Sequence, residues 1–440
     1  AINRTLLYMN KNTDTINDII IPFEEYDLEN GLHVILHRDN TAPLVAVSMM
    51  YHVGSKNENP EMTGFAHFFE HLLFEGSENI PRGQFFNIVQ NAGGTMNANT
   101  SNDRTFYYEL FPSNHLETGL WLESERLLHA KVDQTGIETQ RSVVKEERRQ
   151  RYDNRPYGTL VEEGMKRVFK SHPYNWSVIG SMDHIDAAQE HDYKHFYDTY
   201  YVPNNAVLCI SGDFEVNETK ELIHKYFGLI PKGENEVYRP DIIEPDLENE
   251  LRDTIFDNVQ LPAVVHIYRI PGYAIGDYFA VKLLSDMLSG GASSRLHKAL
   301  VDEQQKAVYT GSFPFDLEHP GVVLQFAIGN MGISVDELEK AMDDEVASIQ
   351  NQLMDEREFQ KLMNQTETQL VYEKSSLLEI AEGLSTYYTY FKNTSMYNEQ
   401  LQHFTAVTRE DIQKVAKKYF KKENRVALHW LPKLEEEAAI

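Results

Sequence analysis

Two histidines and a glutamate stand close together in the segment His67-Phe68-Phe69-Glu70-His71. On a helix, positions i, i+3 and i+4 share one face, so these three side chains point to the same side. Two imidazoles suit Zn²⁺, and a carboxylate beside the ion can take a proton from a bound water. Burying such groups among apolar neighbours is costly unless a metal compensates. The pattern predicts a zinc site with Glu70 as general base, against the alternative of histidines on a purely structural helix.

A zinc site of this kind needs a third protein ligand, and the helical pattern of residues 137–152 offers two candidates. Val143 and Val144 predict the buried face of this helix. Glu147 follows them by three and four residues and projects near that face, whereas Glu146 is rotated to the side. Periodicity therefore favours Glu147 over Glu146 as the ligand. The alternative is that both glutamates form surface ion pairs with nearby arginines.

The elements that must position these residues form two series along the chain. The first series has strand and helix patterns at residues 32–36, 44–50, 65–74, 95–110, 116–130, 137–152, 159–170, 206–210 and 216–227. The second has them at residues 263–269, 276–288, 322–328, 335–354, 356–390, 411–419 and 426–430. Because both series mix strands with amphipathic helices in a similar order, we expect a structural duplication.

A change of composition separates the two series. Residues 234–250 are acidic, contain two prolines and have little apolar periodicity, which is typical of a linker between domains. We expect an N-terminal arm at 1–21, a zinc-binding catalytic domain at 22–233 and a second domain without metal ligands at 251–440. The predicted fold is α+β, with two structurally similar domains joined by the acidic linker. Each domain has a mostly antiparallel sheet with helices packed on one face.

The net charge restricts the choice of partners. The chain has 41 Lys+Arg and 68 Asp+Glu residues, a formal charge of −27, which repels nucleic acid and anionic membrane surfaces. No apolar run is long enough to suggest a membrane span. Cys209, the single cysteine, lies in an apolar run that predicts a buried strand, so it is expected to be structural. We expect a periplasmic or exported location rather than a cytoplasmic one.

Beyond the zinc motif, several segments resemble the pitrilysin/insulysin family of zinc metallopeptidases, whose HxxEH motif inverts the thermolysin-type order. The resemblance covers most of residues 22–430 and is strongest to the short, two-domain members such as mitochondrial processing peptidase. The segments that carry it are residues 28–34, 54–58, 64–67, 73–77, 92–100, 143–156, 201–206 and 212–214.

The resemblance implies one Zn²⁺ per chain, held by His67, His71 and Glu147. It implies a zinc-dependent endopeptidase in which Glu70 activates a zinc-bound water and returns the proton to the leaving amine. The segment around Asn97, Ala98 and Asn99 resembles the family's active-site edge strand. Such a strand would hold an extended peptide through main-chain hydrogen bonds.

Two positions depart from the family pattern. Gln140 stands where the family often has a second glutamate, so this residue could bond a ligand or a water but could not act as a base. In the second half, complete members carry an Arg and a Tyr seven residues apart, whereas here Val301 takes the place of the Arg and Tyr309 is shifted by one. A valine cannot stabilise an oxyanion. Short members work as two facing chains, so the resemblance implies a homologous partner that supplies these groups, in a heterodimer or, less favoured, a homodimer.

Two other functions stay open. The chain could be a metal-bearing subunit that is weakly active or only holds substrate, or a zinc hydrolase of non-peptide substrates. The presence of all four site residues argues for catalysis, and the edge strand argues for peptides. If acidic side chains line an enclosed chamber, the charge of −27 would attract basic peptides toward the zinc.

Overall fold

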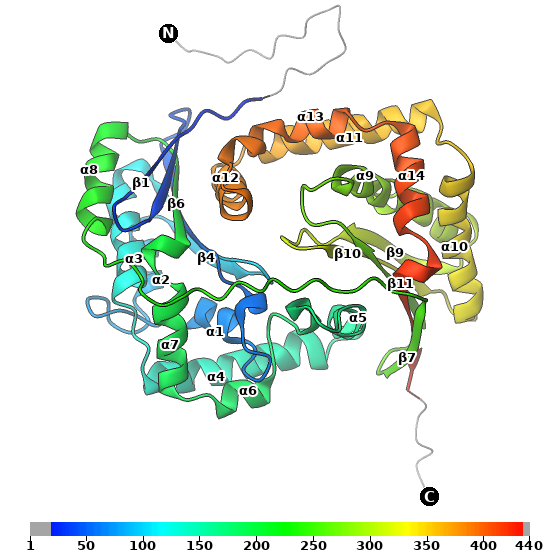
Figure 1. Ribbon diagram of the computed structural model, residues 1–440, viewed down its shortest axis with the longest axis horizontal. Helices are drawn as coiled ribbons and strands as arrows, with labels where there is room; N and C mark the ends of the chain where they lie inside the picture. Colours follow the sequence, from blue (N-terminus) through cyan, green and yellow to red (C-terminus); the bar gives the residue numbers. More distant parts are fainter. Residues whose placement is uncertain (1–18, 434–440) are drawn as a thin grey trace, which may run out of the picture.

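The computed structural model describes residues 19–433, so residues 1–18 of the predicted N-terminal arm lie outside the described part. The strands form two sheets, one on each side of the molecule in Figure 1. The first sheet, in spatial order, contains β1 (Glu24–Asp27), β2 (His33–Arg38), β6 (Ala206–Gly212), β3 (Leu44–Tyr51), β5 (Thr105–Pro112) and β4 (Thr95–Thr100). The second contains β7 (Leu251–Asp257), β11 (Arg425–Pro432), β8 (Ala263–Ile270), β10 (Gly321–Gly329) and β9 (Ala307–Pro314).

The strand order confirms the duplication in the fold. Strands β2-β6-β3-β5-β4 of the first sheet and β7-β11-β8-β10-β9 of the second follow the same permutation of chain order. In both sheets the first of these pairs is parallel and the remaining pairs are antiparallel. The α+β fold with two similar, mostly antiparallel sheets is therefore as predicted. In each sheet the last strand, β4 or β9, is an open edge.

Helices flank both sheets. The helices that follow strands of the first sheet are α1 (Phe65–Leu72), α2 (Phe85–Asn91), α3 (Leu116–Leu128), α4 (Gln134–Arg148), α5 (Leu160–Val168), α6 (Met182–Ala187), α7 (Glu190–Tyr200) and α8 (Val216–Phe227). Those of the second half are α9 (Tyr278–Ser289), α10 (Val335–Asn351), α11 (Glu356–Glu373), α12 (Leu377–Phe391), α13 (Gln400–Thr405) and α14 (Arg409–Tyr419). Within residues 19–433, no helix has the length and apolar character that a membrane span needs.

Each half lends one helix to the sheet of the other half. Helix α12 packs against β3 and β6, and Leu384 shares a buried core with Cys209 of the first sheet. Helix α5 packs against β8 and β11 of the second sheet. A Cβ atom on Gly164 would lie 2.1 Å from Ile267 Cδ1, so glycine is what lets α5 lie directly on β8. Figure 1 shows both helices between the two sheets. The two cores are therefore interlocked rather than separate.

Two predicted elements are each divided in the structure. Residues 95–110 do not form one strand but the hairpin β4–β5, in which Ser101 Oγ accepts hydrogen bonds from the backbone N–H groups of Asp103 and Arg104. The predicted helix 356–390 is two helices, α11 and α12. The break falls where Ser376 caps the start of α12 by accepting a hydrogen bond from Glu379 N. In both places a hydrogen bond from the backbone to a serine side chain marks the break between the two elements, and apolar periodicity alone does not reveal such a break.

The segment between α8 and β7 crosses between the halves without helix or strand from residue 231 to residue 250. It is held against the first half by several hydrogen bonds. Glu244 accepts hydrogen bonds from the backbone of Lys170, Ser171 and His172, and Arg239 donates to His52 O. This connection lies in front of the molecule in Figure 1 and spans the space between the two sheets.

Candidate active site

Helix α1 carries both histidines and the glutamate of the motif. The chain enters it through Gly64, whose φ of 95° is in the left-handed region that favours glycine. The Glu58 carboxylate accepts hydrogen bonds from Gly64 N and Ala66 N, which fixes the first turn of the helix. Phe68 and Phe69 are fully buried in the core of the first half. The helix therefore has little freedom to rotate, and His67 and His71 face the same side, as their spacing predicts.

Glu147 of α4 completes this cluster. Its Oε2 atom lies 3.1 Å from His71 Nε2 and 3.6 Å from His67 Nε2, and the two Nε2 atoms lie 3.3 Å apart. Hydrogen bonds from His67 and His71 hold the pKa of Glu147 well below its usual range. Arg151, one turn further, contacts the other carboxylate oxygen at 2.9 Å. The structure thus brings Glu147 to the two histidines.

Glu146 points elsewhere. Its side chain is 50% exposed and pairs with Arg149, while Gln150 donates a further hydrogen bond to it. The predicted buried face of α4 was only half right: Val144 is fully buried, but Val143 is 44% exposed. A single buried valine still places Glu147, three residues later, on the inner face.

The geometry of the three ligand atoms fits a zinc ion. Ligands about 2.0–2.1 Å from a tetrahedral zinc lie about 3.3 Å from one another. The observed separations of 3.3, 3.1 and 3.6 Å surround that value. Two imidazoles and one carboxylate also form a donor set of catalytic zinc sites, which keep a further position for water or substrate. His67, His71 and Glu147 could therefore hold Zn²⁺ without rearrangement.

Glu70 lies beside this cluster and is oriented by a residue from the edge strand. Thr100, the last residue of β4, donates a hydrogen bond of 2.5 Å from Oγ1 to Glu70 Oε2. Sequence reasoning did not single out Thr100. The signal was available in the two-residue period of the strand, since Met96, Ala98 and Thr100 share one face and Ala98 packs in the core that contains α1.

The register of the hairpin tells which backbone groups of β4 face outward. Ser101 N donates to Arg104 O, so Ser101 and Arg104 form a hydrogen-bonded pair next to the turn. Such pairs alternate along an antiparallel ladder, so Asn97 and Asn99 direct their backbone groups to β5, and Ala98 directs its own to the open edge. In agreement, Ala98 N donates to the side chain Oδ1 of Asn97. Of the three predicted substrate-binding residues, Ala98 directs its main-chain N–H and C=O groups to the open edge of the sheet.

Asn99 connects the edge strand to the second half. Its Oδ1 atom accepts a hydrogen bond from Arg104, and the same guanidinium bonds Glu382 on α12 at 2.5 Å. Gln140, which was expected near a ligand or a water, donates to Glu75 Oε1 at 2.6 Å. Arg82 bonds the other oxygen of Glu75. Gln140 thus links α4, which carries Glu147, to the segment that follows α1, which carries the two histidines.

Val301 and Tyr309, the two positions of the second half that depart from the family pattern, lie in a π-helical turn and on an edge strand. Val301 lies in the π-helical turn His297–Glu303, whose i to i+5 hydrogen bonds include Gln304 N to Ala299 O. Tyr309 lies on the open edge strand β9 and is 57% exposed, and its ring centroid lies 5.6 Å from that of Phe326 with the two rings tilted by 30°.

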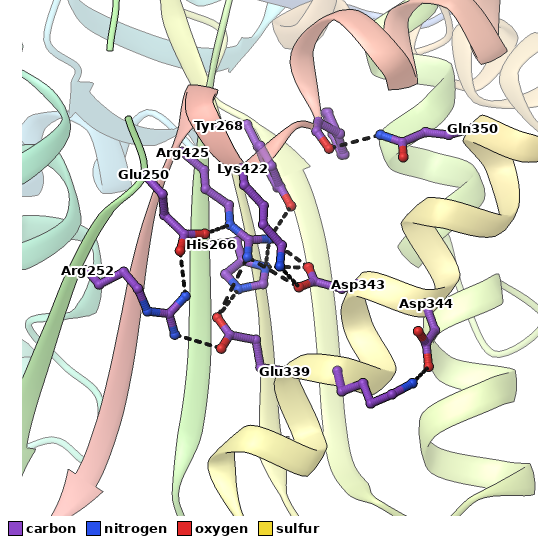
Figure 2. A network of polar contacts seen from close by, with 12 residues as sticks. Glu250, Arg252, His266, Tyr268, Glu339, Asp343, Asp344, Gln350, Lys422 and Arg425 are labelled. Carbon is purple, nitrogen blue, oxygen red and sulfur yellow. Dashed lines mark hydrogen bonds and ion pairs between the residues drawn. The ribbon is translucent and has the colours of Figure 1, made fainter. Parts of the chain in front are cut away.

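A second group of possible ligands, Asp336, Glu339 and His429, lies in the second half. Figure 2 shows Glu339 within a polar network that also contains Arg252, His266 and Arg425. The Arg252 guanidinium lies 2.7 Å from Glu339 Oε2 and 3.0 Å from His429 Nε2. Because a cation already sits between these two side chains, the network is satisfied internally and does not fit a metal.

Comparisons with known proteins agree with the site. The chain matches the family description "Insulinase (Peptidase family M16)" over residues 33–181 and "Peptidase M16 inactive domain" over residues 189–366. It is 30% identical over 401 residues to "Zinc protease PqqE" of Helicobacter pylori, covering 90% of each chain. It is 26% identical over 211 residues to the "Mitochondrial-processing peptidase subunit beta" of Saccharomyces cerevisiae, covering 48% and 45%.

A solved structure extends this likeness to the fold. The crystal structure of a protease from Helicobacter pylori matches with a TM-score of 0.90 and 29% identity, covering 94% of this chain and 100% of that one. The chain belongs to peptidase family M16, which confirms the predicted resemblance, and it is of the short two-domain type. Its likeness is to zinc proteases.

Proposed function

We propose that this chain is a zinc-dependent endopeptidase that cleaves peptides held in extended form along β4. The observation that carries the proposal is the convergence of His67, His71 and Glu147 at separations suited to zinc, next to Glu70. When bound there, zinc would polarise the peptide carbonyl and lower the pKa of a water molecule. Cleavage also needs a surface that holds the peptide in an extended form. The open edge of β4 can do this, because an edge strand binds the main chain of a peptide and tolerates many side chains.

The chain's own residues perform the remaining steps. A peptide pairs with the outward N–H and C=O groups of Ala98, after displacing the Asn97 side chain from Ala98 N. This pairing brings the peptide carbonyl beside α1, which packs against β4. Glu70 accepts the proton of the attacking water and then donates it to the leaving amine.

By the family resemblance, Val301 stands where complete members carry an arginine, and a valine cannot stabilise an oxyanion. We propose that a homologous chain faces this one and supplies an Arg and a Tyr, so that the active form is a heterodimer. The similarity to a subunit of mitochondrial-processing peptidase supports this assembly. The same observation favours the second candidate, a weakly active or substrate-holding subunit, when the chain is alone.

The test is peptide hydrolysis by the zinc-loaded protein and its Glu70→Gln variant. We expect the variant to keep one zinc per chain and to lose at least about 10²-fold in kcat, because the general base is removed. Unchanged cleavage by this variant would refute the mechanism.

The assay is run with and without any homologous chain that co-purifies. Full activity of the single chain would contradict the need for a donor partner. Substrates rich in Lys and Arg are compared at low salt with acidic ones, because acidic side chains lining an enclosed chamber would attract the basic set and speed its cleavage. Equal rates for the two sets would contradict the preference for basic peptides.

A further inference from the structure

We propose that the Thr100 hydroxyl is a positioning group that orients the Glu70 carboxylate as general base. This inference rests on the proposed peptidase function. It assigns a role to a residue outside the zinc motif, carried by the hydrogen bond of 2.5 Å from Thr100 Oγ1 to Glu70 Oε2. A hydroxyl that donates to an ionised carboxylate forms a charge-assisted hydrogen bond, which is among the stronger ones in proteins.

The direction of this bond is fixed by chemistry. An ionised carboxylate can only accept, so the hydroxyl of Thr100 donates to Glu70. A glutamate side chain has three rotatable bonds and would otherwise sample several rotamers. Holding Oε2 leaves Oε1 as the oxygen that takes the proton from water. Thr100 thus reduces the orientations of the base without touching the ligand atoms of His67, His71 or Glu147.

Thr100 itself stands at the best-anchored end of the edge strand. It is paired with Thr105, whose Oγ1 atom donates to Val53 O inside the core. The turn that follows is closed by Ser101, which bonds the backbone of Arg104 in both directions. As a β-branched residue in a strand, Thr100 has a restricted χ1 angle, so its hydroxyl is presented from a rigid position.

The same residue faces the substrate edge. By the alternation of the ladder, Thr100, like Ala98, turns its backbone N–H and C=O groups away from β5. A peptide that extends along β4 therefore pairs with the residue that holds Glu70. The main chain of Thr100 faces the peptide, and its side chain holds Glu70. Because loss of the hydroxyl alters only the side chain, the proposed effect is on the chemical step rather than on binding.

Two substitutions test this role in the zinc-loaded protein, assayed together with any partner chain that it needs. Thr100→Val has the same shape without the donor, and Thr100→Ser keeps the donor. We expect Thr100→Val to lower kcat about tenfold with KM and zinc content unchanged, and Thr100→Ser to restore most of the loss. Thr254→Val, an exposed threonine on strand β7 of the second sheet and outside the proposed site, is the matched control and should keep the wild-type kcat.

A binding measurement supplies a readout that is independent of turnover. In the Glu70→Gln background, the affinity for an uncleaved peptide should be the same with Thr100 or Val at this position. The proposal is overturned if Thr100→Val keeps full kcat, if Ser performs no better than Val, or if peptide affinity or zinc content falls with Val. Failure of the peptidase function itself looks different: the wild type would then cleave no faster than Glu70→Gln.

Discussion

The proposed chemistry depends on a few side chains whose surroundings leave them little freedom. His67 and His71 are fixed by a helix whose aromatic residues are buried and whose first turn is bonded by Glu58. Glu147 gains a low pKa from the two histidines and a further contact from Arg151. Because contacts within the protein already fix these side chains, binding of a metal or a peptide would require little further loss of conformational entropy.

At this scale we predict that Glu147→Gln removes most of the bound zinc, since a neutral amide is a much poorer ligand than a carboxylate. Zinc per chain, measured by atomic absorption after dialysis, should fall severalfold, and cleavage should fall with it. Glu146→Gln is the matched control, because its side chain is 50% exposed and directed to Arg149. Equal zinc loss in the two variants would contradict the assignment of Glu147.

Among the elements, the contacts between halves are as important as those within them. The loop after β9 enters the first half, where Lys56 pairs with Asp103 at 2.9 Å and also with Glu318. Next to it, His172 Nε2 and His319 Nδ1 lie 2.9 Å apart across the junction. Asp103 belongs to the β4–β5 turn, so the junction also supports the strand that carries Thr100.

This junction predicts a dependence of stability on pH. Burial, with a smaller effect of His319, lowers the pKa of His172 to about 4, and burial and Lys56 lower the pKa of His319. Below the unfolded value of about 6.5, the unfolded chain binds protons that the folded histidines do not, so stability falls as the pH falls from 6.5 toward 4.

Calorimetry between pH 7 and pH 4.5 should show the melting temperature falling by several degrees, and less steeply in His319→Asn. The exposed His191→Asn serves as control and should keep the wild-type slope. An unchanged slope in His319→Asn would show that the junction histidines do not account for the acid sensitivity.

The molecule consists of two halves with the same strand topology, and one helix of each half packs on the sheet of the other half. Because α12 covers the first sheet and α5 the second, neither half buries its own sheet completely. Hydrogen bonds of Glu244 and Arg239 hold the connecting segment 231–250 against the first half. Because of this shared packing, we expect the two halves to unfold as one cooperative unit, although the sequence divides into two series.

We therefore predict that residues 1–250 and residues 251–440 do not fold when each is expressed alone. Each fragment would expose the apolar surface that the missing helix covers, and should aggregate or melt without cooperativity. Co-expressed, the fragments should form a soluble complex, and the intact chain cut within the linker should stay associated. Two separately stable, monomeric fragments would contradict the interlocked core.

The sequence alone determined the local chemistry. The spacing of His67, Glu70 and His71 places them on one helical face wherever the helix lies, because 3.6-residue periodicity is a local property. Alternating apolar runs likewise predicted the main strands and the α+β class. Periodicity favoured Glu147, yet it misjudged Val143 and merged β4 with β5 and α11 with α12, since the Ser101 and Ser376 hydrogen bonds that end these elements leave no trace in apolar spacing.

Only the tertiary structure decided which distant groups meet. It brought Glu147 to the histidines at 3.1 and 3.6 Å and Thr100 to Glu70, and it exchanged α5 and α12 between the sheets. The outward direction of the Ala98 backbone depends on the hairpin register, which a shift of one residue would reverse. These contacts join residues tens to hundreds of positions apart, and they depend on how the elements pack in three dimensions, which local periodicity does not specify.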